Sequence, residues 1–423
     1  MFSPKTLRRV AFILFGIVLV LTAAHIVWTY VEKGEFEFRV ERIRQAGDPI
    51  YMTDLAMRPV PEGQNAAALL EEAAVWLEEH RDRSGDTHLW HGHDRSGSED
   101  WDEEGWEQAT AYLEQLAPYY AMLDEIPKRP RSSLDFSRGD DPIAVSMIPQ
   151  FREAVDHTHY RVAFDRVAAG RTERAARAAV FLLDLADRCE LPFMIGHLVR
   201  GVVRDSDEIL RLAERQPGFD ARLFREIVDP RLARTQRRVG PPVAPLKEER
   251  VFALWVVRAC LAGDDVEYWD DVLLPNVLWR PMLYRDACRT LDAYDRAIAE
   301  CGVKPEAAQA IADRWRGEYE EVSATYRLTR MHTALPGKLF KEYAAGTAKR
   351  RLTRVVMALL EHRQTHGEWP PDLTPLGDMP LDPYSGKPFL YERRAAGARI
   401  HAAWPGKDWE TLVVDDLAWS WEE

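Results

Sequence analysis

The hydrophobic and polar positions divide the chain into one long apolar run, a series of amphipathic stretches and a short alternating segment near the end. The run covers Val10 to Tyr30, VAFILFGIVLVLTAAHIVWTY, and contains no acid, no base and no proline. At about 1.5 Å per residue, a helix of this length spans the roughly 30 Å hydrocarbon core of a bilayer. The pattern therefore predicts one transmembrane helix over residues 10–30.

The charges on either side of the run predict its orientation. Lys5, Arg8 and Arg9 precede it, and acidic residues such as Glu32 follow it. The positive-inside rule then makes residues 1–9 a cytoplasmic tail and places the bulk of the chain outside a bacterial inner membrane. A cleavable signal peptide is the alternative, but its apolar core is only about 7–15 residues long and ends at a small-residue cleavage site. This run is longer and ends in His-Ile-Val-Trp-Thr-Tyr, which favours a retained anchor.

Residues 31–335 are predicted to form a helical ectodomain, because apolar residues recur there at helical spacing. One stretch, AAGRTERAARAAVFLLDLA, resembles a tetratricopeptide-type helical hairpin, although no second copy follows at a fixed period. The fold class is therefore mainly α, an antiparallel helical array with weak repeat character. The predicted helices include Trp106–Ile126, Phe151–Ala169, Glu173–Arg188, Leu191–Arg215, Phe219–Val228, Lys247–Leu261, Pro281–Ala299, Pro305–Leu328 and Lys338–His366.

Residues 336–423 are predicted to contain this last long helix and a small β-hairpin region. In Leu381-Asp-Pro-Tyr-Ser-Gly-Lys-Pro-Phe-Leu-Tyr391, the Asp382 carboxylate can accept hydrogen bonds from the turn, and Gly386 supplies a positive φ. Alternating residues then predict two strands around a turn at Arg394–Gly397, and a third strand at Thr411–Val414.

Residues 349–419 resemble the C-terminal domain of the major pseudopilin of type II secretion. The features that carry the resemblance are the amphipathic helix, the following H-G-x-W-P and D-P-Y-x-G-K-P motifs, and the hairpin. The chain lacks that family's basic leader and its glutamate five residues into the apolar helix, and some 300 residues separate anchor and hairpin. The resemblance therefore implies a folding or docking unit rather than a pilus subunit. The whole layout also resembles single-anchor membrane proteins of planctomycete-type bacteria, which implies an architecture and no reaction.

The pseudopilin resemblance also implies a candidate calcium site in the loop after the hairpin. Asp408, Asp415 and Asp416 stand in the corresponding stretch and could supply the hard oxygen ligands that calcium prefers. Lys407 and the low content of Gly and Asp weigh against calcium there.

A second candidate metal site is the histidine-rich stretch His88-Leu-Trp-His91-Gly-His93. Three neutral imidazoles could converge on zinc, but a long polar loop can also carry histidines without binding a metal. His362 and His366 lie four residues apart without the glutamate of an H-E-x-x-H motif, and we interpret them as charges that complement the end of a helix. The sequence contains no G-x-S-x-G elbow and no phosphate-binding glycine loop.

Composition narrows the choice of function. The 423 residues carry a net charge of −13, which argues against nucleic acid as a partner. None of the four cysteines forms a C-x-x-C pair; outside the cytosol a disulfide is permitted, and Cys288 and Cys301 are nearest in sequence. The sequence favours a non-enzymatic, membrane-tethered helical scaffold that binds an envelope protein or peptide and has no cofactor. The alternative is a metal-dependent hydrolase that uses His88, His91 and His93.

Overall fold

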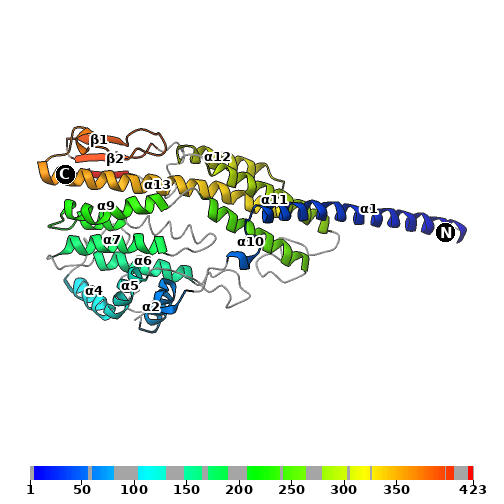
Figure 1. Cartoon of the computed structure of the whole chain (residues 1–423), viewed down its shortest axis with the longest axis horizontal. Coiled ribbons are helices and arrows are strands. Elements are labelled where there is room, and N and C mark those ends of the chain that lie inside the picture. The colour runs from blue at the N-terminus through cyan, green and yellow to red at the C-terminus, as the bar shows by residue number, and fades with distance from the viewer. Residues whose placement is uncertain are drawn as a thin grey trace. The chain divides into compact units, whose positions relative to one another are not determined.

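The computed structural model describes residues 4–55, 60–80, 103–129, 147–163, 170–188, 207–238, 242–262, 279–302, 305–323, 326–395, 397–403 and 418–422. Over these residues the fold is mainly helical, with one long apolar helix near the N-terminus and a small antiparallel sheet near the C-terminus (Figure 1). The predicted fold class is confirmed in these features.

The helices and strands have well-defined bounds. The α-helices are α1 (Pro4–Gln45), α2 (Ala66–His80), α4 (Glu103–Gln115), α5 (Ala117–Glu125), α6 (Met147–Ala163), α7 (Arg171–Arg188), α9 (Ala221–Arg238), α10 (Val243–Ala262), α11 (Arg280–Glu300), α12 (Pro305–Glu321) and α13 (Arg327–His366). The strands are β1 (Leu390–Arg394), β2 (Gly397–His401) and β3 (Ala418–Glu422). Short 3₁₀ helices cover Met52–Leu55, Glu62–Gln64, Ile126–Lys128 and Thr374–Leu376.

The chain divides into two compact units, each built from segments that are distant in sequence. The segments are Met1–Leu55, Pro242–Gly302 and Ala310–Leu339 for unit 1, and Ala56–Pro241, Val303–Gln309 and Phe340–Glu423 for unit 2. Helix α13 therefore contributes to both units, its residues up to Leu339 to unit 1 and the rest to unit 2.

Unit 1 is built on helix α11. Helix α10 runs antiparallel to it, since Arg250 in the first half of α10 pairs with Asp295 near the end of α11. Likewise, Leu261 at the end of α10 accepts a hydrogen bond from Arg280 at the start of α11. The first part of α13 runs parallel to α11, because Thr329 and His332 contact Asp286 and Tyr294 in the same order. The core of the unit consists of Phe36, Ile43, Ile50, Leu254, Val256, Val257, Cys260, Tyr284, Ala287, Cys288, Leu291 and Leu328.

Helix α13 begins earlier than the sequence predicted. We expected one helix over Pro305–Leu328 and another from Lys338, but α12 ends at Glu321 and α13 runs from Arg327 through Pro336. The reason is the buried carboxylate of Asp286 on α11, which accepts hydrogen bonds from the backbone N–H groups of Leu328 (2.8 Å) and Thr329 (2.9 Å). The first N–H groups of a helix have no partner within it, so an acceptor from another helix sets where α13 starts.

Unit 2 packs its helices around α7, α9 and the second part of α13. The apolar centre of α7 is buried as predicted, with Ala176, Ala179 and Leu182 fully enclosed. Helices α9 and α13 run antiparallel and are joined by ion pairs from Arg225 to Glu361 and from Arg354 to Asp229. The predicted apolar stripe of α13 lies in the core; its members are Leu352, Val355, Val356, Leu359 and Leu360.

The three strands form an antiparallel sheet in the order β1-β2-β3, with Tyr391 opposite Ile400 and Ile400 opposite Trp419. The predicted turn before the sheet is confirmed. Fully buried Asp382 accepts hydrogen bonds from the backbone of Tyr384 (3.1 Å) and the hydroxyl of Ser385 (2.8 Å), and Gly386 has a φ of 65°. Strand β3 lies at Ala418–Glu422, whereas the expected strand at 411–414 falls outside the described residues.

Candidate functional site

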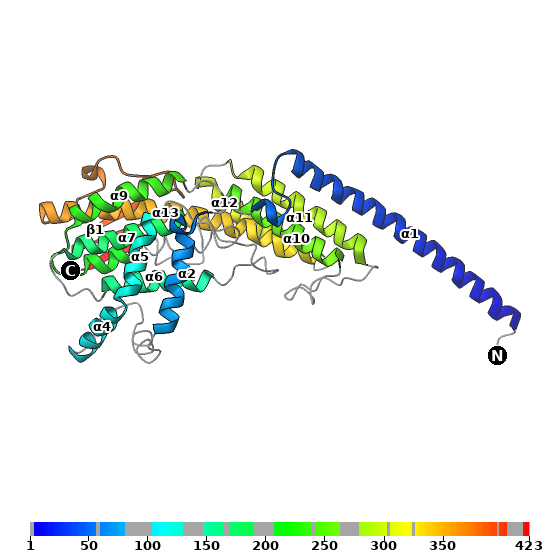
Figure 2. The same ribbon diagram turned by 60° about the horizontal axis from the view of Figure 1, so that its bottom comes forward.

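The N-terminal half of α1 carries most of the large apolar side chains that the described residues expose. Large side chains between Val10 and Val31 are exposed, for example Phe12 at 79% and Leu19 at 54%. The helix has a mean hydropathy of 2.7 over its most apolar window, and no part of that window is buried. By length and composition it can cross a membrane. This half of α1 extends past the end of the α10–α11 pair (Figures 1 and 2).

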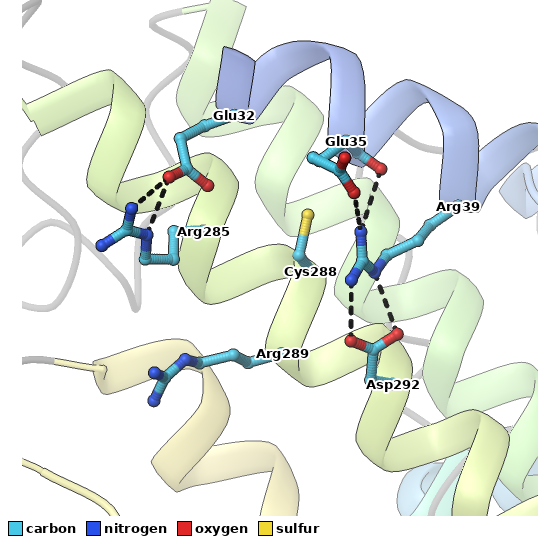
Figure 3. Close-up of a pocket in the computed structure, with 7 residues that line it drawn as sticks. All are labelled: Glu32, Glu35, Arg39, Arg285, Cys288, Arg289 and Asp292. Carbon is cyan, nitrogen blue, oxygen red and sulfur yellow. Dashed lines mark hydrogen bonds and ion pairs between the residues drawn. The ribbon is translucent and has the colours of Figure 1, made fainter. Parts of the chain in front are cut away.

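The second half of α1 is bound to α11 by a row of ion pairs. Glu32 accepts hydrogen bonds from Arg285, and Arg42 contacts Asp295 at 2.5 Å. Arg39 lies between them and contacts Asp292 (Figure 3). In each pair the two residues are 253 positions apart, so the helices run parallel and in one fixed register.

An apolar seam lies beside these ion pairs. Phe36 and Ile43 of α1 are 6% and 2% exposed and belong to the same core as Leu291 and Cys288 of α11. The ring centroids of Phe36 and Tyr284 are 5.6 Å apart. Burial raises the pKa of the Cys288 thiol to about 11, so at neutral pH this cysteine is a packing residue rather than a nucleophile.

A pocket of about 260 Å³ opens between the two helices, lined by Glu32, Glu35, Arg39, Arg285, Cys288, Arg289 and Asp292. Most of its charges are already paired. Arg39 contacts both Glu35 and Asp292, while Arg289 points away from these pairs and stacks on the ring of Tyr326 at 3.8 Å (Figure 3). Paired charges hold helices together, but they leave no free acid or base to transfer a proton to a substrate.

The polar groups at the C-terminal end of the apolar run also contact α11. The indole N–H of Trp28 donates to Glu32 at 3.0 Å, and the guanidinium of Arg285 lies 5.5 Å from the centre of the Trp28 ring. Hydrogen bonding to Glu32 raises the pKa of Arg285, so this arginine is charged at any physiological pH. Trp28 thus links the end of the apolar run to α11.

A second pocket of about 600 Å³ shares Arg289 and Asp292 and is also lined by Arg296, Glu318 and Ser323, among others. Beside it lies a buried pair, the hydroxyl of Tyr294 and Nδ1 of His332, 2.6 Å apart. Burial lowers the pKa of His332 to about 3 and raises that of Tyr294 far above its ordinary value, so both are neutral. Because these side chains are only 1% and 2% exposed, no substrate can reach them, and we interpret the pair as structural.

The candidate metal ligands of the sequence analysis lie outside the residues that the structure describes. This holds for His88, His91 and His93, and equally for Asp408, Asp415 and Asp416, so both sites stay predictions. Within the described ranges, no group of three histidine, cysteine or acidic side chains is placed to hold a metal ion.

The structure also describes other histidines and cysteines that were considered from the sequence. His362 and His366 stack at the C-terminal end of α13 with ring centroids 4.1 Å apart; His366 lies in the last turn and His362 directly precedes it. Cys288 and Cys301 are buried thiols and do not form the permitted disulfide. Cys260 is also buried, as its apolar setting predicted.

The row of ion pairs was not predicted from the sequence, although a signal for it exists. The charges at 32, 39 and 42 are acid, base, base, and those at 285, 292 and 295 are base, acid, acid. The spacing is the same in both helices, and the signs are opposite at every step. Such a match between two helices predicts a parallel pair in register.

Comparisons of the chain with protein-family models, with curated proteins and with solved structures found no match. The function is therefore argued from the geometry of α1 and α11.

Proposed function

We propose that this chain is a single-pass membrane protein of the bacterial inner membrane whose helical body acts as a scaffold outside the cytosol. In this proposal residues 1–9 lie in the cytoplasm, residues 10–30 cross the bilayer, and the body binds a protein or peptide partner of the cell envelope. It acts by holding that partner at a fixed place on the membrane and not by catalysing a reaction.

The observation that carries the proposal is the contrast between the two halves of one continuous helix. The first half of α1 has exposed apolar side chains that nothing in the described chain covers, and lipid is the solvent that suits them. The second half is joined to the body through Glu32, Arg39 and Arg42. A cleavable signal has no need of such a connection, whereas a permanent anchor uses it to orient the body.

The flanking charges support the proposed orientation. Lys5, Arg8 and Arg9 lie before the apolar half of α1, and the first acidic residue after it is Glu32. A reporter enzyme that is active only outside the cytosol, fused after Glu423, tests this directly. Activity of this reporter is expected, and a fusion that is active only as a cytosolic reporter would overturn the proposed topology.

The binding function is tested by photo-crosslinking of the full chain in its native membrane. Residues 1–45, which contain the anchor without the body, serve as the control bait. The expected result is one envelope protein or peptide captured reproducibly by the full chain and absent from the control. If both baits capture only lipid or the same background proteins, the scaffold function is wrong.

Metal analysis separates this proposal from the hydrolase alternative. The purified full chain is expected to carry no stoichiometric zinc, with or without substitution of His88, His91 and His93. If one equivalent of zinc is present and disappears in the substituted chain, the scaffold proposal is wrong and the metal-dependent hydrolase is favoured.

A further inference from the structure

The constant register of α1 and α11 gives the depth of every residue of α11 relative to the apolar run. Two parallel helices with the same rise per residue stay in step along their contact. Glu32 pairs with Arg285, and seven residues further along each helix Arg39 pairs with Asp292. Subtracting 253 from the number of a residue in α11 therefore gives the residue of α1 at the same level.

This register places the first turn of α11 beside the end of the apolar run. Trp279, directly before α11, is level with Ile26, and Arg280 is level with Val27. Because the apolar run ends at Tyr30, both residues lie at the level of its last turn. The start of α11 thus reaches the boundary between hydrocarbon and headgroups, rather than standing clear of the bilayer.

The side chains at this point suit that boundary. Trp279 is 47% exposed, and Arg280 is exposed too. Tryptophan is enriched at the membrane interface, and arginine reaches from it to lipid phosphates. Arg280 makes one long hydrogen bond, 3.4 Å, to the carbonyl of Leu261 at the end of α10. Since a guanidinium has five N–H donors, most of its donors remain for a phosphate group.

We propose that this end of unit 1 is a second membrane contact, in which Trp279 inserts at the headgroup boundary and Arg280 binds a lipid phosphate. The proposal rests on α1 crossing the membrane. Two attachments, the span and the first turn of α11, then fix the tilt of unit 1 relative to the membrane. A single span would leave this tilt variable. A second copy of the chain packed against Trp279 is the competing occupant, and the test distinguishes the two.

The test places the photo-crosslinker benzoylphenylalanine at single positions of the full chain, reconstituted in vesicles of phosphatidylcholine with phosphatidylglycerol. Position 279 tests the proposal, and position 19, an exposed leucine in the middle of the apolar run, reports on the span itself. Position 299, an exposed alanine on the same helix, is level with residue 46 of the first segment and about 24 Å beyond Tyr30. Lipid adducts are expected at 19 and 279 and not at 299.

Each other outcome is decisive. Adducts at 19 without adducts at 279 would overturn the second contact and leave the anchor standing. No adduct at either position would refute the span, and with it the proposed function. Equal labelling of 279 and 299 shows unspecific contact, and crosslinking of 279 to another copy of the chain identifies the competing interface; both overturn the proposal.

A separate experiment tests the contact between Arg280 and a lipid phosphate. Arg280→Gln is expected to lower the adduct yield at 279 about fivefold in vesicles that contain phosphatidylglycerol, the effect of one basic residue at an anionic surface. The same substitution leaves the yield at 19 unchanged. Addition of free inorganic phosphate is expected to leave the yield at 279 unchanged. If free phosphate lowers this yield as strongly as the substitution does, the group bound by Arg280 is a soluble anion and not a lipid.

Discussion

Arg39 of α1 donates two parallel hydrogen bonds to the carboxylate of Asp292 of α11, from Nε to Oδ1 at 2.9 Å and from Nη2 to Oδ2 at 3.0 Å. Hydrogen bonding to this carboxylate raises the pKa of Arg39 further above its ordinary value, although burial opposes the shift. Bidentate pairs fix direction as well as distance. The pair thus determines how α1 is rotated against α11.

Exchange of the two charges tests this connection. Arg39→Ala is expected to destabilise unit 1 by about 0.5–1 kcal/mol, since the Asp292 side chain is 48% exposed and solvent weakens the pair. Arg39→Asp costs more, because it places two carboxylates together, and the double exchange Arg39→Asp with Asp292→Arg recovers most of the loss. Thermal unfolding of the full chain in detergent measures each step.

The matched control is Lys33→Ala, which removes an exposed pair with Glu37 on the same helix and is expected to change little. A double exchange as unstable as Arg39→Asp alone would show that the pair does not join the helices.

The start of α13 gives a second prediction. Asp286 is 4% exposed and accepts from two backbone N–H groups of α13 and from the Thr329 hydroxyl, while burial raises its pKa above the ordinary value. Asp286→Ala leaves the two buried N–H groups without an acceptor, at a cost of about 2–4 kcal/mol, while the Thr329 hydroxyl keeps the backbone carbonyl of residue 286 as an acceptor. Asp286→Asn keeps one acceptor oxygen and is expected to cost about half as much.

Hydrogen exchange of the Leu328 and Thr329 amides checks this directly, because their protection should fall in Asp286→Ala. Asp313→Ala, an exposed position on α12, is the control. Unchanged protection of the two amides in Asp286→Ala would contradict the role of Asp286.

The helix start also shows where sequence reasoning reached its limit. The apolar run, the centre of α7 and the turn at Asp382 follow from neighbours in the chain, and periodicity or turn chemistry predicts them. The start of α13 depends on Asp286, some forty residues earlier, which no local pattern reveals. Pro336 and Gly337 look like a helix break, yet α13 continues through both. Gly337 lies where α12 approaches α13, so closely that a Cβ there would stand 3.2 Å from the carbonyl oxygen of Ala312.

The same limit applies to the candidate site. Sequence reasoning predicts the apolar half of α1, because apolarity over one continuous stretch is a local property. It does not by itself find the surface of α11 that receives the other half, 253 residues away. That requires a comparison of charge spacing between all pairs of helices, in which the series starting at Glu32 and Arg285 stand out by their equal steps and opposite signs.

Glu214 predicts a pH dependence in unit 2. Burial raises the pKa of Glu214 to about 7. The hydrogen bond that its carboxylate accepts from the indole of Trp421 at 3.1 Å lowers the pKa and only partly offsets this effect. The folded state therefore holds a proton that the unfolded state has lost above its pKa of 4.5. The contribution of Glu214 to stability is complete below pH 4.5 and is lost as the pH rises through 7.

Glu214→Gln removes this titration and keeps an acceptor for Trp421. The denaturant concentration at which half of the protein is unfolded should decrease as the pH is raised from about 5 to about 7.5 in the unsubstituted chain. In the variant this decrease should be smaller. Glu208→Gln, on the same helical segment, is the control and should retain the slope of the unsubstituted chain. Equal slopes in all three proteins would show that Glu214 titrates normally.

The turn at Asp382 gives the last prediction. Its carboxylate, fully buried, accepts from the backbone N–H groups of Tyr384 and Ala403, the latter at 3.0 Å and 21 residues along the chain. It therefore ties the turn before β1 to the end of β2. Asp382→Ala should destabilise the sheet by about 1–3 kcal/mol, since two half-buried backbone donors lose their acceptor. Asp378→Ala, nearby and exposed, should change stability by less than about 0.5 kcal/mol.

Limited proteolysis measures this effect where it occurs. In Asp382→Ala, cleavage after Arg393 and Arg399 should accelerate by the factor that the lost stability predicts, because the sheet must open before a protease can bind these strands. Cleavage within α1 should not change. If sites in both units become sensitive together, Asp382 supports the whole fold, and the sheet is not a separate cooperative element.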